Sequence, residues 1–128
     1  MAVIYSITGI NARLNGVVTV LDAGPSNARM LLLAAAAVVS TIVLNKPSAT
    51  VSGGVLTIVG APLDPSAAGG GTITEARLTD STGTVIISGL TAGIPGSGAD
   101  VIVSNGLNST VISGGQTVQL LAGQIIGS

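Results

Sequence analysis

The carboxylates are the first place to look for chemistry, because the chain contains no histidine and no cysteine. Five are present, at Asp22, Asp64, Glu75, Asp80 and Asp100. They are scattered along the chain, and none of them shows the D-x-D-x-D-G spacing of a calcium-binding loop. Two carboxylates brought together by folding could hydrolyse a glycosidic bond. Such sites normally carry aromatic residues that stack on the sugar, and this chain has one aromatic residue. A carboxylate hydrolase is therefore only a secondary alternative.

Covalent catalysis lacks its supporting groups as well. Serine and threonine are abundant, but a hydroxyl nucleophile needs a neighbouring base, usually histidine, to take its proton. The single lysine, Lys46, precedes Pro47 in a predicted turn, which is a poor setting for a buried, activated amine. The glycine-rich segment 93–98 leads into a strand-like run at 100–104, whereas a phosphate loop leads into a helix. We expect a hairpin loop there, and we expect no enzyme activity, no cofactor and no metal.

Charged and aromatic residues that do no chemistry can still form an interface. Glu75 and Arg77 lie two positions apart on a predicted strand and so share one face of it. An ion pair across strands or between subunits is the favoured interpretation. Arg13 and Arg29 flank a predicted helix, where they either contact an acidic partner or are simply solvated. Together with Tyr5, these four residues are the candidate interface residues.

The scarcity of charge sets this chain apart from an ordinary soluble domain. Charged residues make up 7% of the 128 residues and the formal net charge is −1, whereas about 25% charged residues are typical. Nearly neutral chains tend to associate, so we expect identical copies or a partner to cover much of the surface. A secreted or extremophile module of low charge is the alternative. Four basic residues are too few for a nucleic-acid-binding face.

Targeting and membrane signals are not evident. The first residues have no basic region followed by an apolar core and a cleavage site, so they do not read as a signal peptide. The longest aliphatic run, 30–44, includes Ser40 and Thr41 and is shorter than the ~20 apolar residues of a spanning helix. We expect a soluble protein with no membrane partner.

One short helix is predicted near the N-terminus. Residues 1–8 alternate weakly and could form an extended arm, and the helix is predicted over 9–24. Asn11 could cap it, and Gly24-Pro25 would end it. The helical spacing is that of the apolar residues Ile10, Leu14, Val17, Val18 and Leu21.

The remainder, 27–128, favours short strands separated by turns rich in glycine and proline. The run Ala34 to Ala37 could equally be helical. Asp80 to Gly83 is a predicted turn, because the aspartate side chain can bond the backbone and glycine accepts positive φ. About eight strands follow the helix, which indicates an antiparallel β-sandwich of the jelly-roll type in a single domain, 1–128.

The order of these segments resembles a group of small structural proteins of tailed bacteriophages, the capsid cement or decoration proteins. The resemblance covers roughly residues 10–126. It implies a jelly-roll-like domain with a short N-terminal helix that assembles as trimers on the outside of a capsid. It rests on the segments Ala12-Arg13-Leu14-Asn15, Leu21-Asp22-Ala23-Gly24, Ser52-Gly53-Gly54-Val55-Leu56-Thr57, 72–85, Gly98-Ala99-Asp100-Val101 and Ser113-Gly114-Gly115-Gln116-Thr117-Val118.

The functional expectation is a virion structural protein that is made in the host cytoplasm. It would bind between major capsid subunits on the outer shell and stabilise the shell, because a ligand of the assembled state alone favours that state by mass action. A neck, tail or fibre-base protein of the same virion is one alternative. A carbohydrate- or receptor-binding module is another, although a single aromatic residue weakens it.

Overall fold

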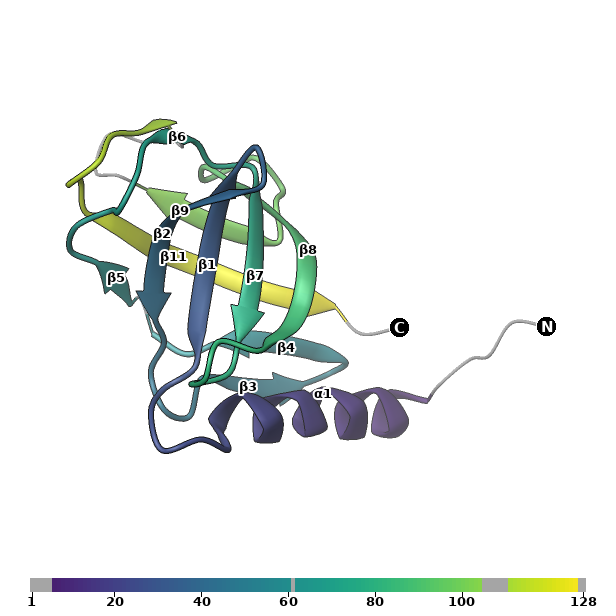
Figure 1. The fold of residues 1–128 in the computed structure, drawn as a ribbon. Helices are drawn as coiled ribbons and strands as arrows, with labels where there is room; N and C mark the ends of the chain where they lie inside the picture. Colours follow the sequence, from purple (N-terminus) through teal and green to yellow (C-terminus); the bar gives the residue numbers. More distant parts are fainter. Residues whose placement is uncertain (1–5, 61, 105–110, 127–128) are drawn as a thin grey trace.

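The computed structural model describes residues 6–60, 62–104 and 111–126, in which one α-helix precedes eleven β-strands (Figure 1). This confirms the prediction of a mainly β protein with an N-terminal helix. The elements are α1 (Ile7–Asp22), β1 (Arg29–Ala34), β2 (Ala37–Val43), β3 (Ala49–Ser52), β4 (Val55–Ile58), β5 (Leu63–Asp64), β6 (Gly71–Thr72), β7 (Glu75–Thr79), β8 (Val85–Gly93), β9 (Val101–Ser104), β10 (Val111–Ile112) and β11 (Val118–Ile126).

Helix α1 begins and ends two residues earlier than predicted. Its N-cap is Ser6, whose Oγ accepts a hydrogen bond of 3.1 Å from the backbone N–H of Gly9. Such a bond satisfies one of the free N–H groups of a first helical turn. The expectation that Asn11 caps the helix is wrong, because Asn11 lies inside it. Its Oδ1 instead accepts a 2.8 Å hydrogen bond from the N–H of Gly54, which ties α1 to the β3–β4 turn.

The strands form one strongly curled, mixed sheet in the order β2-β1-β7-β8-β9-β11-β4-β3, with β5 also paired to β11 and a separate two-stranded sheet of β6 and β10. The neighbours are antiparallel except β8 and β9, which run parallel over the two pairs Ala92↔Val101 and Gly93↔Ile102. The expectation of purely antiparallel pairing is therefore wrong at this point. The ladder continues from β2 to β3, and two facing sheets of a jelly roll are not clearly separated.

Two long strands explain the curl. Strand β8 pairs with β7 along most of its length and with β9 at its end. Strand β11 pairs with β9 and β5 at its start and with β4 at its end. Each has a glycine within it: Gly89 has φ 75°, and a Cβ on Gly123 would lie 2.8 Å from a side-chain carbon of Ile58. Glycine inside a strand marks such bends and close approaches.

Tight turns link the hairpins. Gly53 and Gly54 join β3 to β4 with φ 60° and 80°, which suits the two-residue turns that match strand twist. Ala35 and Ala36 join β1 to β2 with φ 49° and 69°, so the helical alternative for this alanine run is wrong. The predicted turn after β7 is confirmed, because Asp80 Oδ1 accepts hydrogen bonds from the N–H of Thr82 (2.9 Å) and of Thr84 (3.0 Å).

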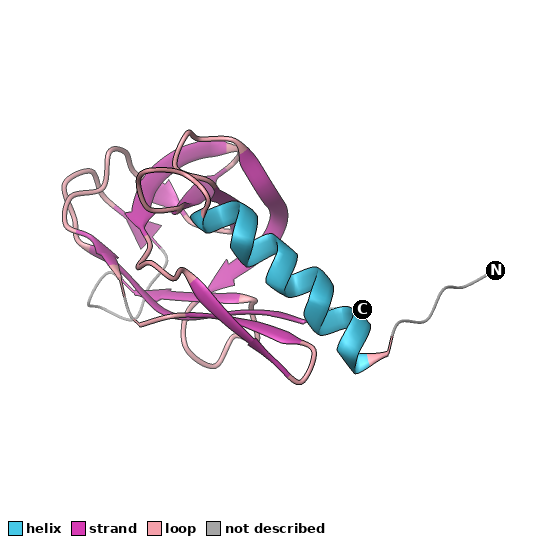
Figure 2. Ribbon diagram, turned by 90° about the horizontal axis from the view of Figure 1, so that it is seen from below, coloured by secondary structure: helices cyan, strands magenta, loops and turns pink. Residues whose placement is uncertain are grey.

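A buried cluster joins the inner faces of the strands to one side of α1. The helix lies across one end of the curled sheet, beside the β3–β4 hairpin (Figures 1 and 2). Within the described residues, no helix is long and apolar enough to cross a membrane. The largest fully buried side chains are Leu21, Met30, Leu32, Leu33, Ile42, Leu44, Leu56, Ile73, Leu78, Leu120, Val101 and Val103.

Candidate interaction surface

Three of the five predicted interface residues come together on one sheet face. Strands β1 and β7 are adjacent, with Arg29 opposite Thr79 and Leu31 opposite Arg77. Directly opposed residues of an antiparallel pair lie on the same face, so Arg29 and Arg77 are diagonal neighbours. Glu75 follows on that face of β7. The alternate residues face the core and are fully buried: Met30, Leu32, Ala76 and Leu78.

The predicted ion pair exists, but within one strand. Arg77 Nε lies 3.2 Å from Glu75 Oε2, and the two side chains are 34% and 33% exposed. The expectation of a pair across strands or between subunits is therefore wrong for this contact. Positions two apart on one strand lie on the same face, close enough for an arginine to reach back to a glutamate. A pair this exposed contributes about 0–1 kcal/mol to stability, so its main effect is to orient Arg77.

Two exposed valines extend this face to both neighbouring strands. Val43 of β2 lies opposite Arg29, and Val85 of β8 lies opposite Thr79. They are 53% and 46% exposed. Figure 1 shows the four strands side by side, with α1 below their ends. We call this surface the arginine face; it consists of Arg29, Leu31, Val43, Glu75, Arg77 and Val85.

The other two predicted residues are not part of the arginine face. Arg13 is exposed on α1, where it lines a groove of about 250 Å³ with Ile10, Leu14 and Val17. Tyr5 lies outside the described residues. Arg13 thus lies within α1, whereas Arg29 begins β1. The expectation that both arginines flank the helix is wrong for Arg13.

Asp64 has a structural role that the sequence did not indicate: its carboxylate bonds to the edge strand β2. Asp64 of β5 accepts hydrogen bonds at Oδ2 from Ser40 Oγ (2.8 Å) and from the N–H of Thr41 (3.3 Å), both on β2. Its Oδ1 accepts a 3.1 Å bond from the N–H of Ser66. The last bond follows from the Asp-Pro-Ser turn chemistry, but nothing in the sequence indicates the contact with β2. Asp64 therefore connects β11, through β5, to the opposite end of the curled ladder.

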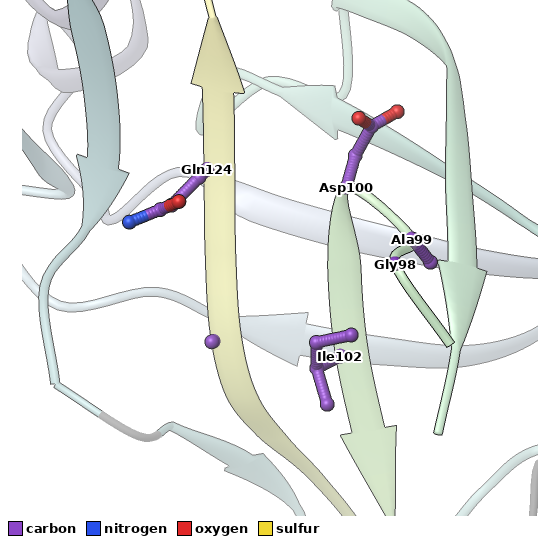
Figure 3. A pocket seen from close by; sticks show the side chains of 6 residues that line it. Gly98, Ala99, Asp100, Ile102 and Gln124 are labelled. Carbon is purple, nitrogen blue, oxygen red and sulfur yellow. The ribbon is translucent and has the colours of Figure 1, made fainter. Parts of the chain in front are cut away.

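A shallow hollow lies between β9 and β11. It has a volume of about 300 Å³, and Figure 3 shows the Asp100 and Gln124 side chains pointing away from each other rather than into a common centre. Asp100 Oδ2 already accepts bonds of 3.0 and 3.1 Å from the N–H and hydroxyl of Thr91. Gly93 ends β8, and residues 94–100 form the loop that leads into β9. The expectation of a hairpin loop here is wrong, because β8 and β9 run parallel. This arrangement has none of the converging polar groups of a ligand site.

The remaining carboxylates support turns and chain crossings. The pKa of Asp80 is lowered, first by the hydrogen bond from the Thr82 hydroxyl and then by the backbone N–H groups of Thr84 and Thr82. Asp22 accepts bonds of 3.1 and 3.2 Å from the N–H of Ser48 and so holds the end of α1 to the start of β3. Within the described parts of the chain, no three histidine, cysteine or acidic residues group to hold a metal ion.

Comparison with protein-family models, with curated proteins and with solved structures found no match. What the fold and the surface define is a mainly β protein with one N-terminal helix, a strongly curled sheet, and an open sheet face on which arginines stand between exposed valines.

Proposed function

We propose that this protein is a structural subunit of a virion, a capsid decoration protein that binds between major capsid subunits on the outside of the shell. The observation that carries the proposal is a surface that combines little charge with exposed aliphatic side chains. Among the described residues, large hydrophobic side chains that are 42–58% exposed occur on α1 and on five strands: Ile7, Val20, Val38, Val43, Leu63, Val85, Val111 and Leu121.

Such a surface suits association better than isolated existence. Full burial of one valine or leucine side chain contributes about 1.5–3 kcal/mol, so covering several partly exposed ones favours binding. The centres of protein interfaces are also depleted of charge, and few charges here would have to lose their hydration. A weak contact repeated at many symmetry-related positions then stabilises the assembled shell by mass action. This requires no catalytic group, no cofactor and no nucleic-acid contact.

One end of the sheet offers a way to pair with a neighbour. The outer side of β2 is partly occupied, because Val39 O accepts a bond from Gly69 N–H and Thr41 N–H bonds to Asp64. Among the described strands, β3 pairs only with β4, and α1 is packed beside it. Strand β3 carries no charged residue and no proline. Strand edges without such residues readily accept another strand. Edge pairing at β3 is the form of contact that we propose, within a trimer of jelly-roll-like subunits.

Copy number tests the proposal and separates its variants. Quantitative mass spectrometry of purified particles would find hundreds of copies per particle for a shell protein, and a dozen or fewer for a neck, tail or fibre-base protein. Absence of the chain from purified particles would contradict a virion role. A glycan array that showed specific binding would then favour the carbohydrate-binding alternative.

A further inference from the structure

We infer that the arginine face is a docking site for an acidic segment of a partner protein, an extended segment with acidic residues at positions i and i+2. The inference rests on the proposed function, since it names the chemistry of the partner surface. It differs from the β3 edge contact in both place and mechanism.

The two guanidinium groups have unused hydrogen-bonding capacity. A guanidinium carries five N–H donors in a planar fork. The Arg77 side chain uses Nε for Glu75, and no other hydrogen bond of this side chain is found among the described residues. Arg29 is half-buried, and its guanidinium has no hydrogen-bond or ion-pair partner among the described residues. The forks are therefore open to carboxylates, which arginine binds in bidentate geometry.

Charge is concentrated on this face. Of the chain's four basic and five acidic residues, the face holds two basic residues, Arg29 and Arg77, and one acidic residue, Glu75. It is therefore positive on a molecule that is negative overall. A partner of opposite charge is attracted to it, whereas the same face of a second copy is repelled. Charge complementarity thus selects an acidic partner over self-association through this face.

The spacing of the two arginines fits an extended partner. Diagonal neighbours on adjacent antiparallel strands are about 7–8 Å apart. Alternate residues of an extended segment, which point to the same side, are about 7 Å apart. Two acidic residues at positions i and i+2 would therefore meet Arg29 and Arg77 together. The side chains at i−1, i+1 and i+3 point away from this face, so the two carboxylates carry the contact.

A peptide titration of the ¹⁵N-labelled protein, followed by NMR, tests this directly. The probe is the capped peptide VDTDV, and the matched control is VNTNV, which keeps the shape and removes the charge. We expect the amide signals of β1 and β7 around Arg29 and Arg77 to shift with VDTDV. Because each exposed ion pair is worth a factor of about 1.4–5 in affinity, the control peptide should bind roughly tenfold more weakly. The difference should shrink from about 0.01 M to about 1 M salt, as the Debye length falls from about 30 Å to about 3 Å.

Protein variants complete the test. R29Q and R77Q should each weaken VDTDV binding several-fold, and R13Q, which removes an exposed arginine from α1, should leave it unchanged. Equal binding of both peptides, no binding of VDTDV, or an equal effect of R13Q would overturn the inference. Tighter binding of inorganic phosphate than of VDTDV would overturn the assignment to carboxylates. Shifts of the same signals with protein concentration alone would show that a second copy is the occupant.

The outcome is independent of the virion role. If VDTDV fails to bind while the protein is abundant in particles, this inference falls and the proposed function stands. If VDTDV binds as expected while the protein is absent from particles, the docking site stands and the proposed function falls.

Discussion

Asp64 links β2, at one end of the curled ladder, to β11 through β5. Its removal should be costly for a residue so near the surface. We consider Asp64→Ala. The substitution leaves Ser40 Oγ, on a fully buried residue, without its 2.8 Å acceptor. The N–H of the half-buried Thr41 also loses its contact of 3.3 Å, whereas the N–H of the exposed Ser66 can turn to water.

The expected loss follows from these three bonds. A hydrogen bond to a charged group contributes about 1.5–3 kcal/mol, and an unsatisfied buried hydroxyl costs about 1–3 kcal/mol. Both free energies describe the loss of the same Ser40 contact, so they are not added together. The long Thr41 contact adds a smaller amount, and the exposed Ser66 contact adds almost nothing. We expect Asp64→Ala to lower the free energy of unfolding by about 2–4 kcal/mol, a large part of the ~5–15 kcal/mol typical of a domain.

Urea unfolding followed by far-ultraviolet circular dichroism measures this loss. The m-value, which is the slope of the unfolding free energy against urea concentration, should be the same for the wild-type protein and the variant if both unfold in two states. The matched control is Asp100→Ala, which removes an exposed carboxylate bonded to Thr91; it should cost less than about 1 kcal/mol. In the double-mutant cycle with Ser40→Ala, we expect a coupling of about 1–2 kcal/mol. A loss below about 0.5 kcal/mol for Asp64→Ala, or strict additivity with Ser40→Ala, would refute the fastening role.

Three further predictions concern single turns and contacts. The pKa of Asp80 is lowered by the hydrogen bonds of its turn, that from the Thr82 hydroxyl first. The contribution of Asp80 to stability is therefore present above its unfolded-state pKa and is lost as pH falls through its folded-state pKa. Urea titrations at several pH values should show that Asp80→Asn destabilises the protein at neutral pH and ceases to do so in acid. The double substitution Ala35→Asn and Ala36→Gly should raise the free energy of unfolding by about 1–2 kcal/mol. Both alanines have positive φ, and the sequence Asn-Gly favours such a turn. An unchanged free energy of unfolding would argue against that turn geometry. Gly123→Ala should lower the free energy of unfolding by about 1–3 kcal/mol through overpacking. Gly16→Ala, with no atom within 4 Å of the new Cβ, should raise it by about 0.5–1 kcal/mol. Equal melting temperatures for the two variants would contradict the close approach at Gly123.

Local patterns predicted the local structure well. The spacing of apolar residues from Ile10 to Leu21 indicates a helix, and α1 is found there because those residues form one face of it. The cap was misplaced, because Ser6 and Asn11 are both good capping residues and only the chain direction before the helix decides between them. The turn at Asp80 was predictable for the same local reason, since its side chain bonds N–H groups within four residues.

Long-range pairing decided the rest. Arg29 and Arg77 share a face only because β1 lies beside β7, and no periodicity within either strand indicates that neighbour. Asp64 and Ser40 are likewise far apart in sequence. The curl depends on β8 and β11 changing partner strands along their length. The alternation of apolar and polar residues along a strand does not indicate whether its partner strand changes. The parallel contact between β8 and β9 has the same cause, so an antiparallel sandwich was the natural but incomplete expectation.

Reconstitution tests most directly whether an assembly covers this surface, as we propose. Purified protein would be added to virion shells that lack it, and the melting temperature of the shell would be recorded as a function of the amount bound. We predict saturable binding at a fixed number of sites, with a shell melting temperature that rises with occupancy, as expected for a ligand of the assembled state alone. Shells that bind none of the protein, or bind it with no change in melting temperature, would contradict the account.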